Sequence, residues 1–338
     1  MKTMAESLNN RSSSLSTKIR TQGPCRFILV ASIAVLAGGL PGSASAVDLT
    51  WDANAATAPN PFDGGGTWNT TGLNWWNGSA DVAWTNSTAN IAIFGVSTTV
   101  PAGIPGAINV SGAITAGGLT FNPYVGNNVK YNITGGTSLT LGGAATITMN
   151  TEWARPFAAI NTVLSGTSGL TVQGNGIGIL EIGTQANNFT GGVTLQNGTA
   201  LSIQSSSGLG AASNSLTFAG NASLIGRAAN FNLGSSRSIT INAGATATFD
   251  AIAAANTMTV DGVIGGAGNL RKDGQGVLAL TRANTYTGET RVHQGTLLLN
   301  FNDVASPLNN IVSSSSALRL SGGTLRLTGK DDVANVQT

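Results

Sequence analysis

Short stretches of alternating apolar and polar residues recur along the chain after residue 46. Each has three to five residues, with Leu, Ile, Val, Phe or Met alternating with Thr, Ser or Arg, as at 118–121, 145–149, 238–241 and 317–320. A period of two places alternate side chains on opposite faces of a β-strand. No segment after residue 46 has a sustained helical period of about 3.6 residues, so the pattern predicts an all-β protein.

Glycine and asparagine separate these stretches, and several of their positions recur. The segment from Leu164 matches the segment from Ile264, 100 residues later, with glycines and leucines in step: Gly174, Gly176 and Leu180 against Gly274, Gly276 and Leu280. A β-sandwich or barrel has no need to repeat its turn residues, whereas each coil of a β-solenoid turns at corresponding corners. We therefore predict a single-stranded parallel β-helix, with about 13 coils at about 22 residues per coil.

Residues 1–46 have the order of a secretory signal peptide. Basic residues precede an apolar run at 27–40, and a small-residue triplet follows at 44–46. This order is typical of the basic, apolar and cleavage regions of exported proteins. The run has 14 residues, fewer than the roughly 20 that span a bilayer, so an uncleaved anchor is the weaker alternative. We expect a secreted or cell-surface protein with no transmembrane segment after cleavage.

Composition excludes several classes of protein. Charged residues make up 9% of the chain, and there are one His and one Cys. Without residues 1–46 the chain keeps 11 basic and 13 acidic residues, a net charge of −2. A nucleic-acid-binding protein needs a dense basic surface, and a zinc site needs Cys and His ligands. We therefore expect no nucleic-acid partner, no metal and no cofactor.

Catalytic constellations are also missing from the sequence. The acidic residues between 47 and 249 are scattered, at 48, 52, 63, 81, 152 and 181. We find no pair of them at repeat spacing that could act as general acid and base. His293 has no evident partner acid or thiol, so we interpret it as an exposed strand residue. The sequence predicts no catalytic residue and no enzyme.

Residues 265–299 carry three linked motifs. These are a Leu-x-Lys-x-Gly-x-Gly-x-Leu-x-Leu run at 270–280, Asn-Thr-Tyr-Thr-Gly at 284–288 and Gly-Thr-Leu at 295–297. The segment resembles the autotransporter-associated β-strand repeat, also called the passenger-associated transport repeat. Residues 164–203 resemble a degenerate copy, with Gln173 near the Lys position. The resemblance implies a β-helical passenger domain of a Gram-negative-type bacterium that uses outer-membrane export machinery, with repeats that assist export or folding.

Five of the six tryptophans gather near the start of the exported chain: Trp51, Trp68, Trp75, Trp76 and Trp84. They could form a hydrophobic cap over the first coil, which we favour, or an aromatic platform for sugars. We expect a Trp-rich cap at 47–100 and a β-helix at 101–338. The chain ends just after a strand pair with no polar capping coil, so we also expect a C-terminally truncated sequence.

Two functions remain open from the sequence. The first is a β-helical structural or adhesion protein, an adhesin of the outer-membrane surface whose partner could be a surface glycan or matrix. The alternative is a β-helical protein that binds or degrades polysaccharide, and it rests on fold analogy and on the tryptophans.

Overall fold

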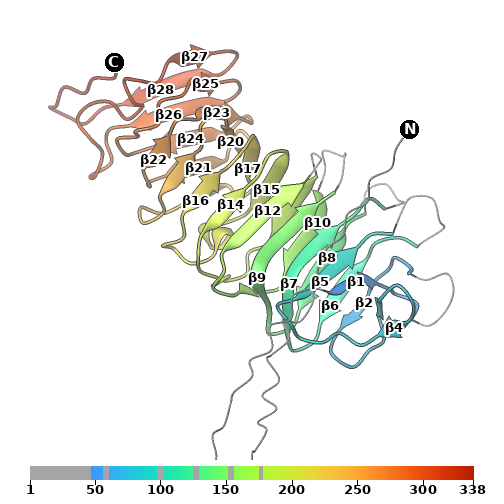
Figure 1. Cartoon of the computed structure of the whole chain (residues 1–338). Helices are drawn as coiled ribbons and strands as arrows, with labels where there is room; N and C mark the ends of the chain where they lie inside the picture. The colour runs from blue at the N-terminus through green and yellow to red at the C-terminus, as the bar shows by residue number, and fades with distance from the viewer. Residues whose placement is uncertain (1–46, 56–60, 97–102, 125–128, 151–155, 175–177) are drawn as a thin grey trace, which may run out of the picture. The chain divides into compact units, whose positions relative to one another are not determined.

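The computed structural model describes residues 47–338 apart from 56–60, 97–102, 125–128, 151–155 and 175–177 (Figure 1). The predicted signal peptide, residues 1–46, lies outside the described residues. The described chain consists of strands and one short 3-10 helix, η1 (Ser206–Leu209). The strands stack coil upon coil into a β-solenoid, so the predicted all-β class and parallel β-helix are confirmed.

The strands form three sheets. The 12-stranded sheet runs, in spatial order, β4 (Asp81–Val82), β3 (Trp75–Trp76), β1 (Val47–Trp51), β5 (Asn90–Phe94), β7 (Ala113–Phe121), β9 (Ser138–Met149), β12 (Leu170–Gly174), β14 (Val193–Leu195), β16 (Leu216–Phe218), β19 (Ile239–Ile241) and β22 (Ile264–Gly266), with β11 (Leu164–Ser165) also paired to β9.

The 11-stranded sheet runs β2 (Gly66–Trp68), β6 (Ala107–Val110), β8 (Tyr131–Gly135), β10 (Pro156–Asn161), β13 (Ile179–Ile182), β15 (Thr199–Ile203), β17 (Ala222–Gly226), β20 (Thr246–Ala251), β23 (Asn269–Asp273), β25 (Thr290–Val292) and β27 (Leu318–Leu320). The 5-stranded sheet runs β18 (Asn230–Asn232), β21 (Thr257–Val260), β24 (Val277–Leu280), β26 (Thr296–Asn300) and β28 (Thr324–Thr328).

Apart from the antiparallel pairs that β3 makes with β1 and β4, the paired strands of the described residues are parallel. The register shifts locally between β10 and β13 and between β7 and β9. In the 11-stranded sheet, one inward-facing position recurs from coil to coil as Leu180, Leu201, Leu224, Phe249, Lys272 and Val292. Stacking like positions gives a continuous apolar core and leaves alternate residues outside. On the 12-stranded sheet the outward positions include a column of threonines, Thr146, Thr171, Thr194, Thr217 and Thr240.

The expected number of about 13 coils is too high, because among the described residues the all-parallel sheet has eleven strands, one for each coil at most. Coil length is not constant along the chain, contrary to the assumption behind that number. The coil that leads from Gly66 to its partner Ile108 is the clearest exception, since β3, β4 and β5 intervene. The coil from Thr290 to Leu318 is also longer than the one before it, from Leu270 to Thr290. Insertions at corners lengthen these coils without changing the register of the strands that they connect.

The internal repeat appears in the structure as a shared corner. The N–H groups of Leu164 and Ile264 donate to the Oδ1 atoms of Asn187 and Asn284, each at 2.8 Å. Two residues after each N–H lies a glycine with positive φ, 126° in the first copy and 103° in the second. At both glycines an added Cβ would lie 2.1 Å from a carbonyl oxygen of the preceding coil, so only glycine fits.

Beyond this corner the two copies follow different sheets. Leu170 lies in β12 of the 12-stranded sheet, whereas its match Leu270 lies in β23 of the 11-stranded sheet. Leu180 and Leu280 likewise lie in the 11-stranded and 5-stranded sheets. The sequence match therefore identifies equivalent turn chemistry, but the second copy is displaced by one face of the solenoid.

Candidate functional site

Four of the five N-terminal tryptophans form one buried cluster. Trp75 lies at its centre, with its ring centroid 5.3 Å from that of Trp51, 5.0 Å from Trp68 and 4.6 Å from Trp84. Each of the four has at most 1% of its surface exposed. Phe94 packs against three of them and stacks on the next coil, so the cluster is continuous with the apolar core.

Local strand pairing positions this cluster. Trp51 ends β1 and lies opposite Trp75 in the antiparallel pair β1–β3. Adjacent strand residues face opposite sides, so Trp75 points into the cluster while Trp76 is half-buried. A sugar needs an open ring face for stacking, and only Trp76 retains exposed surface. The packing supports the interpretation as a cap, and a platform built from all five rings stays a prediction.

A buried carboxyl group lies beside the cap. Asp52 follows β1, and its Oδ1 accepts hydrogen bonds from the N–H groups of Asn54 and Phe62, each at 3.2 Å. Burial is the main reason why the pKa of Asp52 rises to about 6, and the neighbouring Asp81 raises it as well. Because the carboxyl binds the backbone N–H groups of Asn54 and Phe62, its visible role is to hold these two residues near the end of β1.

In the repeat, Lys272 occupies an inward position between Phe249 and Val292 of the neighbouring strands. The residue is 0% exposed. Its Nζ donates to the carbonyl oxygens of Asp273, Gly274 and Gln294 at 2.5, 2.8 and 3.2 Å. Burial lowers the pKa of this ammonium group to about 8. The lysine of the motif therefore satisfies the carbonyls of two stacked corners from inside the core.

The Asn-Thr-Tyr-Thr-Gly motif joins three coils at another corner. Asn284 accepts the N–H of Ile264 and donates to the carbonyl of Ile311, both at 2.8 Å. The Tyr286 hydroxyl is 2.6 Å from Thr290 Oγ1. In the degenerate copy Asn187 retains the first contact, and Phe189 fills the aromatic position without a hydroxyl. The motif residues are thus structural, with polar groups directed at backbone of adjacent coils.

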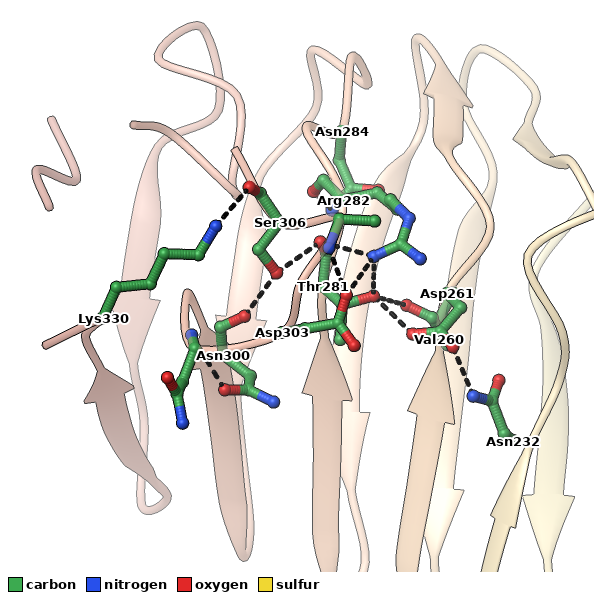
Figure 2. A network of polar contacts seen from close by, with 12 residues as sticks. Asn232, Val260, Asp261, Thr281, Arg282, Asn284, Asn300, Asp303, Ser306 and Lys330 are labelled. Atoms are coloured by element: carbon green, nitrogen blue, oxygen red, sulfur yellow. Dashed lines mark hydrogen bonds and ion pairs between the residues drawn. The ribbon is translucent and has the colours of Figure 1, made fainter. Parts of the chain in front are cut away.

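Figure 2 shows a polar network next to this corner. The network runs along the C-terminal ends of the strands of the 5-stranded sheet. Arg282 Nη1 lies 2.8 Å from Asp303 Oδ1, and Ser306 Oγ donates to the carbonyl of Thr281 at 2.8 Å. The Lys330 ammonium donates to the Ser306 carbonyl at 3.3 Å. These contacts connect successive coils. A partly exposed ion pair such as Arg282–Asp303 adds about 1 kcal/mol or less.

Sequence reasoning missed the partners of His293. Its Nδ1 lies 2.8 Å from Asp273 Oδ1 and 3.1 Å from Arg271 Nη2. Asp273 lies one coil earlier in the chain, and the coil period was the signal that could have found it. The imidazole is nearly half exposed, and its two partners also pair with each other at 2.9 Å. Arg271, Asp273 and His293 thus form a polar cluster on the outer face of the 11-stranded sheet.

No set of three or more His, Cys, Asp or Glu side chains within the described ranges is arranged to hold a metal ion. Among the same residues, no helix has the length and apolar character needed to cross a bilayer.

The packing of the cap predicts unequal effects of two adjacent substitutions. Trp75→Ala should lower the free energy of unfolding by about 3–5 kcal/mol, because it leaves a cavity among three rings. Trp76→Ala removes a half-buried ring and should cost about 1 kcal/mol or less. Urea unfolding followed by circular dichroism measures both. Equal losses in the two variants would contradict the cap.

Burial of Lys272 predicts an alkaline rise in stability. The folded chain releases this proton at about pH 8, and an unfolded lysine releases it near pH 10.4. The unfolded chain therefore binds more protons between these values, so the free energy of unfolding rises with pH. Unfolding measured between pH 7 and pH 10 should show this rise in the natural chain and in Lys330→Met, and lose it in Lys272→Met. Parallel profiles in all three would show that Lys272 does not titrate in this way.

Comparison with known proteins agrees with these motifs. Residues 270–299 match the family profile of the Passenger-associated-transport-repeat. The chain is 33% identical over 294 residues to the "Adhesin BmaC autotransporter" of Brucella suis biovar 1 (strain 1330). The match covers 85% of this chain but spans only 8% of that protein. No solved structure gives a significant match. The predicted resemblance is thus confirmed: the chain carries a passenger-associated transport repeat within a β-solenoid similar to part of an autotransporter adhesin.

Proposed function

We propose that this chain is a surface-exposed, passenger-like segment with a role in adhesion. The observation that carries the proposal is its similarity, over 85% of its length, to a protein named as an adhesin autotransporter. The solenoid supports it, because stacked strands present long polar faces on which many weak contacts can add up. The proposed location is the outer surface of a Gram-negative-type bacterium, or its medium.

The proposed role of the repeat is to support export or folding, together with the outer-membrane export machinery. Lys272 and Asn284 each bind backbone groups of adjacent coils from buried positions. These side chains offer buried hydrogen-bond donors to the next coil, so a folded repeat can guide the docking of the coil that follows it. This proposal needs no catalytic group.

A non-enzymatic role is part of the proposal. Lys272 of the repeat holds backbone carbonyls, and Arg271 and Arg282 pair with Asp273 and Asp303. The alternative, a polysaccharide-degrading β-helix, rests on fold analogy and on the tryptophans. A reducing-sugar assay of the purified chain separates the two. Release of sugar from any polysaccharide would favour the alternative.

Adhesion is tested with the exported chain attached to beads. We expect the beads to be retained on at least one of three surfaces, coated with acidic polysaccharide, neutral polysaccharide or extracellular-matrix protein. Beads carrying a heat-unfolded sample of the same chain serve as the control. Retention no greater than that of the control on all three surfaces would overturn the adhesion proposal for this segment.

The register of the coils allows a precise test of export. Leu270 and Thr290 are stacked partners, so removing residues 270–289 deletes one coil of the repeat and keeps the strands aligned. Removal of residues 201–223 deletes one coil elsewhere, since Leu201 pairs with Leu224. In a Gram-negative host, quantitative immunoblots should show a severalfold lower exported amount for the first deletion only. Equal export of both deletions would count against a special role of the repeat.

A further inference from the structure

The outer face of the 11-stranded sheet is hollowed over β13 to β23. The depression has a volume of about 480 Å³. Its floor is a column of small outward side chains, Ala200, Ser223 and Thr248, which pair in register from strand to strand. Asp250 and Asp273 line it toward the carboxyl ends of the strands. The floor of the depression therefore presents the hydroxyl groups of Ser223 and Thr248.

The same column continues as three arginines. Thr248 pairs with Arg271, Arg271 with Arg291, and Arg291 with Arg319. Their strands β20, β23, β25 and β27 follow one another in Figure 1, and paired strands are about 4.8 Å apart. Arg271 lines the large depression and, with Arg291, a second one of about 160 Å³. The groove therefore leads directly onto the arginine column.

Two of the three arginines form no ion pair among the described residues. Arg271 pairs with Asp273 at 2.9 Å. Arg291 Nε donates to Ser321 Oγ at 3.2 Å. Across the described part of the chain no carboxylate forms an ion pair with Arg291 or Arg319. Glu289 lines the smaller depression without pairing to either arginine.

The three stacked arginines lower the stability of the chain when no ligand is bound. Like charges placed directly opposite on neighbouring strands are destabilising, and threonine at these positions would avoid the repulsion, as on the 12-stranded sheet. Sites that break such a local rule are often functional. An external anion would offset the repulsion, and guanidinium groups bind carboxylate and sulfate through paired hydrogen bonds.

We propose that this groove binds an extended acidic polysaccharide. The sugar hydroxyls lie over Ser223 and Thr248, and carboxylate or sulfate groups bind Arg291 and Arg319. A linear polymer suits the site because the groove and the arginines follow one line across successive strands. This inference rests on the proposed adhesive function and names the ligand class and the site.

The test measures the affinity of the purified chain for three probes by surface plasmon resonance. The probes are heparin, polygalacturonate and neutral dextran, which separate sulfate, carboxylate and uncharged sugars. We expect binding to at least one acidic probe and none to dextran. The double variant R291Q/R319Q should bind about tenfold more weakly or worse, since charge-assisted hydrogen bonds are lost. Equal affinity in this variant, or equal binding of dextran, overturns the proposal.

Two further variants locate the site. Arg326 is an exposed arginine on β28 of the 5-stranded sheet, so R326Q removes the same charge from another face and should leave the affinity unchanged. Ser223→Trp fills the floor of the groove and should weaken binding as strongly as the double variant. An equal loss in R326Q, or full affinity in Ser223→Trp, would show that binding is unspecific electrostatic attraction.

Thermal unfolding separates a binding role from a structural role. R291Q/R319Q should melt at or above the temperature of the natural chain, because the variant relieves repulsion. A clearly lower melting temperature would mean that the arginines support the fold. In the bead assay, retention on matrix protein alone, unchanged in R291Q/R319Q, would preserve the adhesive function and reject this groove.

Discussion

Strand-to-strand backbone hydrogen bonding in register is the constraint on which this structure depends. Each strand is satisfied by the coils before and after it, so a corner that shifts by one residue would turn the core side chains outward. The corners are therefore the most specified parts of the chain. Gly166 and Gly266 pass close to the preceding coil, and Asn187 and Asn284 hold the N–H groups at the same corners.

The periodicity of two predicted the sheet class, and recurring glycines predicted the solenoid, because both are local signals. The number of coils was harder to predict from the sequence. The segment between Gly66 and Ile108 contains two additional strands, β3 and β4, and the register of the pair is kept. Nothing in composition separates such an insertion from a coil. Matching of sequence copies also could not show that Leu170 and Leu270 lie on different faces, since the two copies share the chemistry of the corner that precedes these residues.

Polar residues of the candidate sites were harder to predict than the fold. Lys272 is charged and would ordinarily be assigned to the surface, yet it occupies an inward position and binds three carbonyls. The family motif identified it, but its location follows only from register. For the tryptophans the sequence left a cap, which we favoured, and a sugar platform as alternatives. The pairing of Trp51 with Trp75 and the burial of four rings support the cap.

The same register divides the surface into columns that differ in chemistry. The 12-stranded sheet repeats threonine, which is neutral and favourable on an exposed strand. The 11-stranded sheet changes along one column from alanine, serine and threonine to three arginines. Because the inward columns pack the core, and a buried charge such as Lys272 needs several hydrogen-bond partners there, variation for binding is expected at outward columns. A repeated fold can therefore acquire a linear, charge-graded binding surface through substitutions at a single outward position per coil.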